Sequence, residues 1–316
     1  MKKYLVIDSG GTKTAAILYD ENCGRLGVCV TGSLRTNTTP DPLYEKHSNA
    51  IISSLGLCGA VIESVRGTYE DRFLKMLKSV CEVKDAFRDG EMELGLSAAG
   101  LFGDGVLALC GTGATVFARY KGERYAAGGY GAAVSDEGSG YYIGRQALSA
   151  AIRDFECRGP KTALTEALAA HFGNYGREDF RSAVFSIYMQ SERSPVARVG
   201  RCAPVVIETA EKGDATAKKI LIDAGTIMGE MTAALIKKHS LPSDIPVALS
   251  GSVWRANPLF YKGFVSVIGR EPVVPKLEPV AGAVARAYYD RFGKADTGYI
   301  ASAFPEFTYD INKMKK

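Results

Sequence analysis

The chain has 316 residues, 46% of them hydrophobic and 23% charged, and its formal net charge is only +4. These values are typical of a globular protein of one or two domains, and the absence of a basic block argues against a nucleic-acid partner. No apolar run is long enough to span a membrane. Lys2 and Lys3 precede an apolar run that Asp8 ends, which indicates a strand and not a signal peptide. A cytoplasmic protein without a nucleic-acid or membrane partner is expected.

The N-terminal segment predicts a hairpin with a phosphate site. Residues 4–19 contain an apolar strand ending at Asp8, a turn with the sequence Gly-Gly-Thr-Lys-Thr, and a second apolar strand. Residues 24–31 predict a third strand. Glycines let backbone amides approach phosphate oxygens, and threonine hydroxyls add donors. The turn lacks the spacing of a Walker loop and, alone, would be typical of any tight hairpin.

These three strands are expected to form an antiparallel meander, and the segment after it is less regular. Residues 32–40 form a polar loop rich in turn formers, which can hold a site. Residues 42–54 predict a helix, 55–60 a short strand, and 69–80 a second helix with an apolar stripe. Gly100–Gly105 is interpreted as a turn.

A second hairpin at residues 106–118 repeats the first design around Gly111-Thr112-Gly113. The turn lacks the third glycine of a dinucleotide-binding fingerprint, and a strand follows where that motif has a helix. Two such hairpins can face each other across a cleft and hold a polyphosphate.

The rest of the chain is mainly helical. A glycine-rich loop at 128–140 leads into a helix for which Ser139 is a plausible N-cap. Residues 160–239 predict four helical segments, and Gly225 and Gly229 in the last of them indicate close packing or a ligand. A strand into Gly251, a helix at 256–268, a strand at 272–277 and a helix at 279–293 complete an α/β chain with two sheets.

The cysteines and histidines do not form a recognisable metal site. The seven cysteines are odd in number and widely spaced, as expected of reduced thiols. The three histidines lack the spacing of zinc ligands.

Three of these motifs resemble those of the sugar kinase and actin ATPase superfamily. Asp8–Thr14, Gly111–Gly113 and Gly251–Ser252 are similar to its phosphate-1, phosphate-2 and adenosine motifs. Residues 128–148 and 250–254 narrow the resemblance to N-acetylglucosamine kinases and to the ATPase activators of benzoyl-CoA reductase and 2-hydroxyacyl-CoA dehydratases.

The resemblance implies an α/β fold of two actin-like, ribonuclease H-like domains with a nucleotide cleft between them. Residues 1–107 would form the N-terminal ATPase domain, with a C-terminal helix at about 286–316 packing back on it. Residues 108–285 would form the larger domain. ATP and Mg²⁺ are the implied cofactors, and a homodimer is a family expectation.

The resemblance also implies roles for individual residues. Asp8 would lie near Mg²⁺ and contact it through a water molecule. The residues implied in binding the ATP phosphates and adenosine are Gly10, Gly11, Thr12, Lys13, Thr14, Thr112, Gly113, Ala224, Gly225, Gly251 and Ser252.

A sugar pocket is implied by Asn37, Gly129, Tyr130 and Asp136. Carboxylate and amide groups suit a hydroxyl acceptor, because phosphoryl transfer depends on positioning. Asn37 is equally an ordinary turn residue, and Asp136 with Glu137 could instead complement a helix dipole.

The expected catalytic base is missing. The kinases carry a Gly-x-x-Gly-x-Asp element, whereas this chain has Gly56-Leu-Cys-Gly59-Ala-Val61, so Val61 stands at the base position. The next acidic residue, Glu63, is the candidate base. The kinases also tend to have an Asp before the second hairpin, near where Glu93 falls.

Three functions follow from the resemblance. The first is ATP-dependent phosphorylation of an amino sugar, led by N-acetylglucosamine. The second is an ATP- or sugar-binding sensor with little catalysis, which Val61 favours. The third is an activator ATPase, which holds an iron–sulfur cluster between two subunits through cysteines; Cys110 and Cys157 are outside the expected loops.

Overall fold

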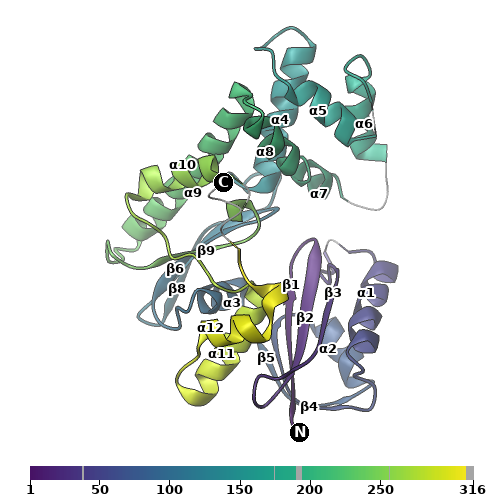
Figure 1. Cartoon of the computed structure of the whole chain (residues 1–316), viewed down its shortest axis with the longest axis vertical. Helices are drawn as coiled ribbons and strands as arrows, with labels where there is room; N and C mark the ends of the chain where they lie inside the picture. The colour runs from purple at the N-terminus through teal and green to yellow at the C-terminus, as the bar shows by residue number, and fades with distance from the viewer. Residues whose placement is uncertain (38, 174, 190–193, 256, 311–316) are drawn as a thin grey trace. The chain divides into compact units, whose positions relative to one another are not determined.

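The chain divides into two compact units (Figure 1). The computed structural model describes residues 1–37, 39–173, 175–189, 194–255 and 257–310. Unit 1 comprises Met1–Gly105 and Val273–Tyr309, and unit 2 comprises Val106–Pro272 and Asp310. The C-terminal part of unit 1 begins at Val273, and its helix α11 (Pro279–Phe292) packs against α3 (Glu91–Ala98) and β1 (Lys3–Ser9).

Unit 1 contains five strands and several helices on both of their faces. The strands are β1 (Lys3–Ser9), β2 (Lys13–Asp20), β3 (Arg25–Gly32), β4 (Val61–Thr68) and β5 (Glu82–Arg88). The helices are α1 (Asp41–Ser54), α2 (Asp71–Lys78), α3 (Glu91–Ala98), α11, α12 (Thr297–Ala303) and the short 3-10 turn η2 (Pro305–Phe307).

The unit 1 sheet has the order β3-β2-β1-β4-β5. The first three strands form the predicted antiparallel meander, whereas β4 and β5 run parallel to β1. The register places Tyr4 opposite Ser64 and Asp8 opposite Thr68, so β1 and β4 end at the same edge. Gly67 allows this pairing, since a Cβ there would lie 1.8 Å from the Ile7 carbonyl oxygen.

Each face of this sheet is covered by helices. Alternate β1 residues point to opposite faces, as the strand period requires. Leu5 and Ile7 join the core beneath α1 and α2, and Val6 joins the core beneath α3 and α11. Figure 1 shows α11 and α12, in yellow, on that second face.

The sequence predictions for residues 55–100 were partly wrong. Residues 55–60 form turns, and the strand begins at Val61. The strand β5 and the helix α3 were missed. Glu93 lies in the first turn of α3, where its carboxylate accepts a hydrogen bond from the Gly90 amide at 3.0 Å.

Unit 2 combines a four-stranded sheet with a helical region. Its strands are β6 (Gly105–Cys110), β7 (Ala114–Tyr120), β8 (Glu123–Gly128) and β9 (Val247–Ser250), in the order β8-β7-β6-β9. Its helices are α4 (Gly140–Phe155), α5 (Leu164–His171), α6 (Phe180–Met189), α7 (Pro195–Gly200), α8 (Ala203–Glu211), α9 (Ala215–Lys238), η1 (Val253–Arg255) and α10 (Pro258–Ile268). Residues 272–277, predicted as a strand, form only isolated bridges.

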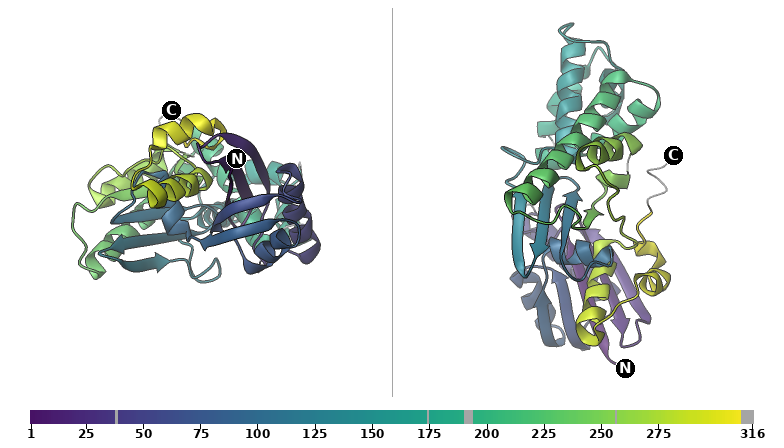
Figure 2. Two further views of the ribbon diagram at one scale, coloured as in Figure 1. Left: turned by 90° about the horizontal axis from the view of Figure 1, so that it is seen from below. Right: turned by 90° about the vertical axis from the view of Figure 1, so that its left-hand side faces the viewer.

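Close packing joins α9 to α10, which lie side by side in green in Figures 1 and 2. A Cβ at Gly225 would lie 1.9 Å from the Phe260 carbonyl oxygen, and one at Gly229 would lie 2.9 Å from that of Phe264. Trp254 lies edge-on to both phenylalanines and donates from Nε1 to the Ala108 carbonyl at 3.0 Å. The glycines predicted in α9 therefore serve helix packing.

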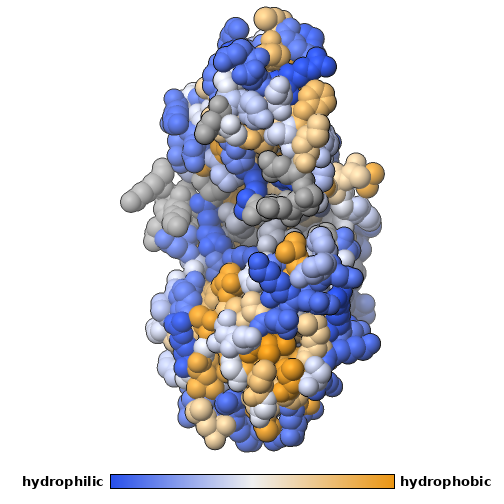
Figure 3. Space-filling view, turned by 90° about the vertical axis from the view of Figure 1, so that its right-hand side faces the viewer, coloured by the Kyte–Doolittle hydropathy of each residue, from blue (hydrophilic) through white to orange (hydrophobic). Residues whose placement is uncertain are grey.

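The surface is chemically mixed. On the face shown in Figure 3, orange hydrophobic side chains are interspersed with blue hydrophilic ones, which is ordinary for a folded protein. Among the described helices, none combines the length and the apolar character needed to cross a membrane.

Candidate functional site

Asp8 lies at the carboxyl end of β1, where its neighbour across the sheet is Thr68. The Thr68 hydroxyl donates to Asp8 Oδ1 at 3.1 Å and accepts a hydrogen bond from the Ser9 amide at 2.7 Å. The carboxylate is thus held in one orientation at the point where β1 enters its turn.

The surroundings of Asp8 disfavour its negative charge. Burial is the main cause that raises the pKa of Asp8 to about 6, and the nearby carboxylates Glu91 and Glu278 raise it further. The Thr68 hydrogen bond and the Lys13 ammonium act in the opposite direction. A divalent cation would relieve this accumulation of negative charge, so the donor set fits the Mg²⁺ expected here.

A magnesium ion at Asp8 would need further ligands that are not protein side chains. Across the described residues, no group of three or more His, Cys, Asp or Glu side chains could hold a metal ion. Mg²⁺ commonly keeps several waters and binds one or two carboxylates together with substrate phosphates. A single carboxylate acting through water is compatible with that pattern.

The β1–β2 turn exposes its backbone. Gly11 and Thr12 are exposed, and a Cβ at Gly11 would meet no atom within 4 Å. The Gly10 amide donates to the Lys13 carbonyl at 2.9 Å, which closes the turn. Thr14 differs from its neighbours, because its side chain is buried and its hydroxyl is 3.1 Å from Ser9 Oγ. The hydroxyl of Thr14 therefore braces the turn instead of facing outward.

The loop that carries Asn37 packs against this turn. Ser33 Oγ donates to the Gly10 carbonyl at 2.8 Å, and the Leu34 amide donates to Ser9 Oγ at 3.3 Å. The Arg35 guanidinium reaches the Ser9 carbonyl at 3.1 Å. Asn37 itself is exposed beside the turn. Two features predicted separately, the phosphate turn and the sugar loop, therefore lie together.

Val61 and Glu63 lie at the other end of β4. Glu63 is five residues before Thr68, which is about 16 Å along an extended strand. Its carboxylate forms an ion pair with Lys84 at 2.7 Å, and it borders a cavity that also contains Tyr4. The prediction that Glu63 replaces the base does not fit this placement, because about 16 Å of β4 separates Glu63 from Thr68, the strand neighbour of Asp8.

The β6–β7 turn in unit 2 is held by Asp136. Asp136 Oδ1 accepts a hydrogen bond from the Ala114 amide at 3.2 Å, and a Cβ at Gly113 would lie 3.0 Å from that oxygen. The structure thus brings together Gly113, predicted to bind the phosphates, and Asp136, predicted to bind the sugar. Asp136 has a φ of 58°, a left-handed conformation unusual for a residue with a side chain.

The N-terminus of α4 is fixed to the same turn. The Gly140 amide donates to the Gly111 carbonyl at 2.8 Å, and the Tyr141 amide donates to the Thr112 carbonyl at 3.1 Å. Ser139 is the predicted N-cap, and its hydroxyl accepts from the Tyr142 amide at 3.1 Å. The positive end of the α4 dipole therefore lies beside the turn, which favours an anion there.

The loop before α4 presents Gly129 and Tyr130. Gly129 has a φ of 74°, and a Cβ there would lie 2.5 Å from Thr115 Oγ1. Tyr130 is 78% exposed, so its ring is available to a ligand.

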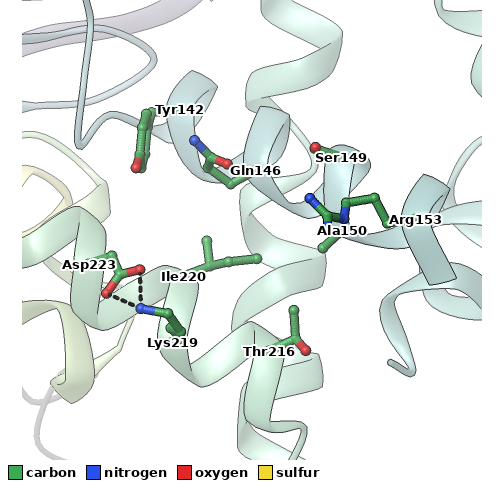
Figure 4. A pocket seen from close by; sticks show the side chains of 9 residues that line it. All are labelled: Tyr142, Gln146, Ser149, Ala150, Arg153, Thr216, Lys219, Ile220 and Asp223. Carbon is green, nitrogen blue, oxygen red and sulfur yellow. Dashed lines mark hydrogen bonds and ion pairs between the residues drawn. The ribbon is translucent and has the colours of Figure 1, made fainter. Parts of the chain in front are cut away.

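A groove of about 260 Å³ runs between α4 and α9 (Figure 4). It begins at Tyr142, directly after Gly140 and Tyr141, whose amides contact the β6–β7 turn, and it extends to Arg153. Asp223 and Lys219 pair at 2.8 Å along its α9 side. The groove combines an aromatic ring, apolar surface and polar side chains; its lining residues are Tyr142, Gln146, Ser149, Ala150, Arg153, Thr216, Lys219, Ile220 and Asp223.

The residues expected to line an adenosine pocket differ in accessibility. Ala224 is fully buried and Gly225 is packed against α10, so neither lines this groove. Gly251 has a φ of 101° and its Cβ would lie 2.2 Å from the Cys110 carbonyl oxygen. Ser252 is exposed at the end of β9. Sequence reasoning missed the groove because it forms only where α4 and α9, which are far apart in the sequence, lie side by side.

Comparison with known proteins is consistent with these features. A profile of the BadF/BadG/BcrA/BcrD ATPase family matches residues 5–287. The chain is 28% identical over 255 residues to an N-acetylmuramic acid/N-acetylglucosamine kinase of Clostridium acetobutylicum, covering 76% of this chain and 81% of that protein. It is 25% identical over 274 residues to an N-acetyl-D-glucosamine kinase of Dictyostelium discoideum, covering 78% and 84%.

Solved structures share the fold. A candidate N-acetylglucosamine kinase from Chromobacterium violaceum superposes with a TM-score of 0.70 at 21% identity, over 90% of this chain and 98% of that one. A ROK-family glucokinase from Streptomyces griseus gives a TM-score of 0.53 at 16% identity, over 90% and 98%. The predicted fold of two actin-like α/β domains is confirmed.

Proposed function

This chain belongs to the BadF/BadG/BcrA/BcrD ATPase family, and from this membership we propose that it transfers a phosphoryl group from ATP to an amino sugar, with N-acetylglucosamine as the leading substrate. The observation that carries the proposal is the arrangement in unit 1. A fixed carboxylate, Asp8, adjoins a turn with an exposed backbone, and the loop bearing Asn37 is bonded to that turn.

In the proposed reaction, the two glycine turns bind the ATP phosphates. The exposed amides of Gly11 and Thr12 are the proposed phosphate donors of unit 1, and Thr112 with Gly113, beside the α4 N-terminus, are those proposed for unit 2. Asp8 would hold Mg²⁺ through water, and the bound ion would neutralise charge on the phosphates.

We propose that the nucleoside of ATP enters the groove between α4 and α9. The groove starts where α4 leaves the β6–β7 turn, so a nucleotide bound by its phosphates at Thr112 and Gly113 can extend along it. The Tyr142 ring and the Ile220 side chain offer apolar contact for a base, while Gln146 and Thr216 offer hydrogen bonds.

Sugar binding is proposed for one residue of unit 1 and three residues of unit 2. Asn37, Gly129, Tyr130 and Asp136 are the proposed sugar-binding residues. Asp136 accepts one amide hydrogen bond through Oδ1 and keeps lone pairs for hydroxyl donors. Fixing the acceptor hydroxyl in one orientation is the main catalytic requirement in phosphoryl transfer.

The activator alternative is less consistent with the cysteines. Cys110 is fully buried, its Sγ contacts the Gly138 carbonyl at 3.4 Å, and burial raises the pKa of its thiol. A cluster ligand must be a thiolate reachable by iron. Cys157 is exposed on the segment after α4.

The test is ATP turnover measured with and without a panel of amino sugars, with ³¹P NMR to identify the product. ADP release that requires N-acetylglucosamine, together with a sugar phosphate, would establish the kinase. Tight ATP and sugar binding without turnover would support the sensor instead. Anaerobic iron analysis of the same preparation tests the activator.

A further inference from the structure

We propose that Glu70 is the general base that accepts the proton of the sugar hydroxyl, an inference that rests on the kinase function proposed above. Glu70 follows β4 and lies two residues beyond Thr68, which pairs with Asp8. It therefore lies at the end of the unit 1 sheet that carries the β1–β2 turn. Glu63, the candidate from sequence, lies at the opposite end.

The Glu70 carboxylate contacts the loop that carries the proposed sugar residue. Its Oε1 accepts a hydrogen bond from the Thr36 amide at 3.0 Å, and Thr36 directly precedes Asn37. The same loop is bonded to the β1–β2 turn through Leu34 and Ser9. One carboxylate thus adjoins the loop proposed to bind the acceptor and, through it, the turn proposed to bind the phosphates.

Glu70 is also available for proton transfer. It precedes the first residue of α2, but its side chain does not cap that helix. Two other carboxylates of unit 1 are committed to cations: Asp71, the next residue along the chain, pairs with Arg88, and Glu91 pairs with Arg35 at 2.6 Å. Within the described part of the chain, no cationic side chain pairs with Glu70, and Oε2 has no hydrogen-bond partner.

In the proposed step, phosphoryl transfer and proton transfer occur together. The sugar hydroxyl oxygen attacks the γ-phosphorus while its proton passes to Glu70. The bond between that phosphorus and the oxygen bridging it to the β-phosphate breaks, and ADP leaves with the bonding electron pair. The proton on Glu70 is then released to water, so one sugar phosphate, one ADP and one proton result.

The deciding experiment uses the full chain with Glu70→Gln. The glutamine oxygen can still accept from the Thr36 amide, so the loop is retained while basicity is lost. We expect kcat for N-acetylglucosamine phosphorylation to fall 10²- to 10⁴-fold. The dissociation constants for ATP and N-acetylglucosamine, and the melting temperature, should stay close to those of the wild type. Formate should restore part of the turnover of Glu70→Ala.

Two further variants serve as controls for the role of Glu70. Glu45→Gln removes an exposed carboxylate of the same unit, which pairs with Arg72 at 3.3 Å, and should leave kcat unchanged. Glu63→Gln tests the rival base and should also leave it unchanged. A wild-type protein that phosphorylates the sugar, with Glu70→Gln equally active, would overturn the role of Glu70 alone. A wild-type protein without sugar phosphorylation would overturn the kinase function, and the base with it.

Discussion

Thr68 and Asp8 lie side by side at the ends of two parallel strands, and one hydroxyl group serves both the carboxylate and the backbone. Thr68 Oγ1 donates to Asp8 at 3.1 Å and accepts from the Ser9 amide at 2.7 Å. The orientation of Asp8 and the start of the β1–β2 turn are therefore set by the same side chain.

Replacement of this hydroxyl should affect stability and activity together. Thr68→Val leaves the Ser9 amide without its acceptor, which typically costs about 1–3 kcal/mol. The substitution also removes the hydrogen bond that lowers the pKa of Asp8, so the acid limb of the turnover profile should move to higher pH. Urea unfolding and a pH–rate profile measure the two effects. Thr68→Ser keeps the hydroxyl and should preserve both properties; if it behaves like the valine variant, the hydroxyl is not responsible.

The raised pKa of Asp8 predicts a specific pH dependence of stability. The folded-state pKa of about 6 exceeds the ordinary 3.8, so the folded chain binds this proton more tightly than the unfolded chain does. Stability contributed by protonated Asp8 is therefore lost as the pH rises from about 4 to about 6. In chelator without nucleotide, Asp8→Asn should escape this loss and be more stable at pH 7 by up to about 3 kcal/mol. Equal pH slopes for the two proteins would contradict the shift.

Two glycines in unit 1 should respond to alanine in opposite ways. A Cβ at Gly67 would lie 1.8 Å from the Ile7 carbonyl, whereas one at Gly11 would meet nothing within 4 Å. Gly67→Ala should prevent stable folding of unit 1. Gly11→Ala should keep the wild-type melting temperature but weaken ATP binding about tenfold or more, because the added methyl group would keep phosphate oxygens away from the turn amides and charged hydrogen bonds contribute about 1.5–3 kcal/mol. Circular dichroism and calorimetric titration separate the cases, and normal ATP affinity in Gly11→Ala would argue against the phosphate role of the turn.

The packing role of Gly225 can be separated from a ligand role. Gly225→Ala would force a Cβ against the Phe260 carbonyl, 1.9 Å away, and overpacking of this kind costs about 1–3 kcal/mol or more. The variant should unfold at lower denaturant concentration. Glu230→Ala, an exposed position on the same helix, is the matched control. A variant of normal stability with weakened ATP binding would restore the adenosine role to Gly225.

The groove in unit 2 offers a direct test of the proposed nucleoside position. Ser149 is exposed on the α4 side of the groove, so Ser149→Trp should fill it without disturbing the core. ATP affinity should fall at least about tenfold, because the base loses its contact surface. Inorganic tripolyphosphate should bind as before. Unchanged ATP affinity would place the nucleoside elsewhere.

The accuracy of the sequence predictions followed the strength of the local signal. The hairpin of residues 4–19 combines apolar strands with glycines, so its position and the place of Asp8 were predicted correctly. The strand β5 escaped prediction because it is an edge strand of mixed charge, in which Glu82, Lys84 and Asp85 hide the alternation. Glu63 was predicted as the base because Gly56 and Gly59 matched the family's glycine element, whereas in the structure these glycines form the turns before β4.

Long-range contacts could not be read from the sequence at all. The hydrogen bond between Glu70 and the Thr36 amide joins residues 34 positions apart, and no motif marked Glu70. The groove between α4 and α9 likewise depends on how two helices pack. The predicted homodimer and the identity of the sugar stay predictions.

The discontinuity of unit 1 has a consequence for biosynthesis. Leu94 and Ala98 share a core cluster with Val280 and Val284, which are translated long after them. Residues 106–272 are contiguous, so unit 2 can assemble as soon as it leaves the ribosome. Unit 1 must wait, with one sheet face uncovered, until α11 emerges. Its nascent chain is therefore the part of this protein most exposed to chaperones and to aggregation.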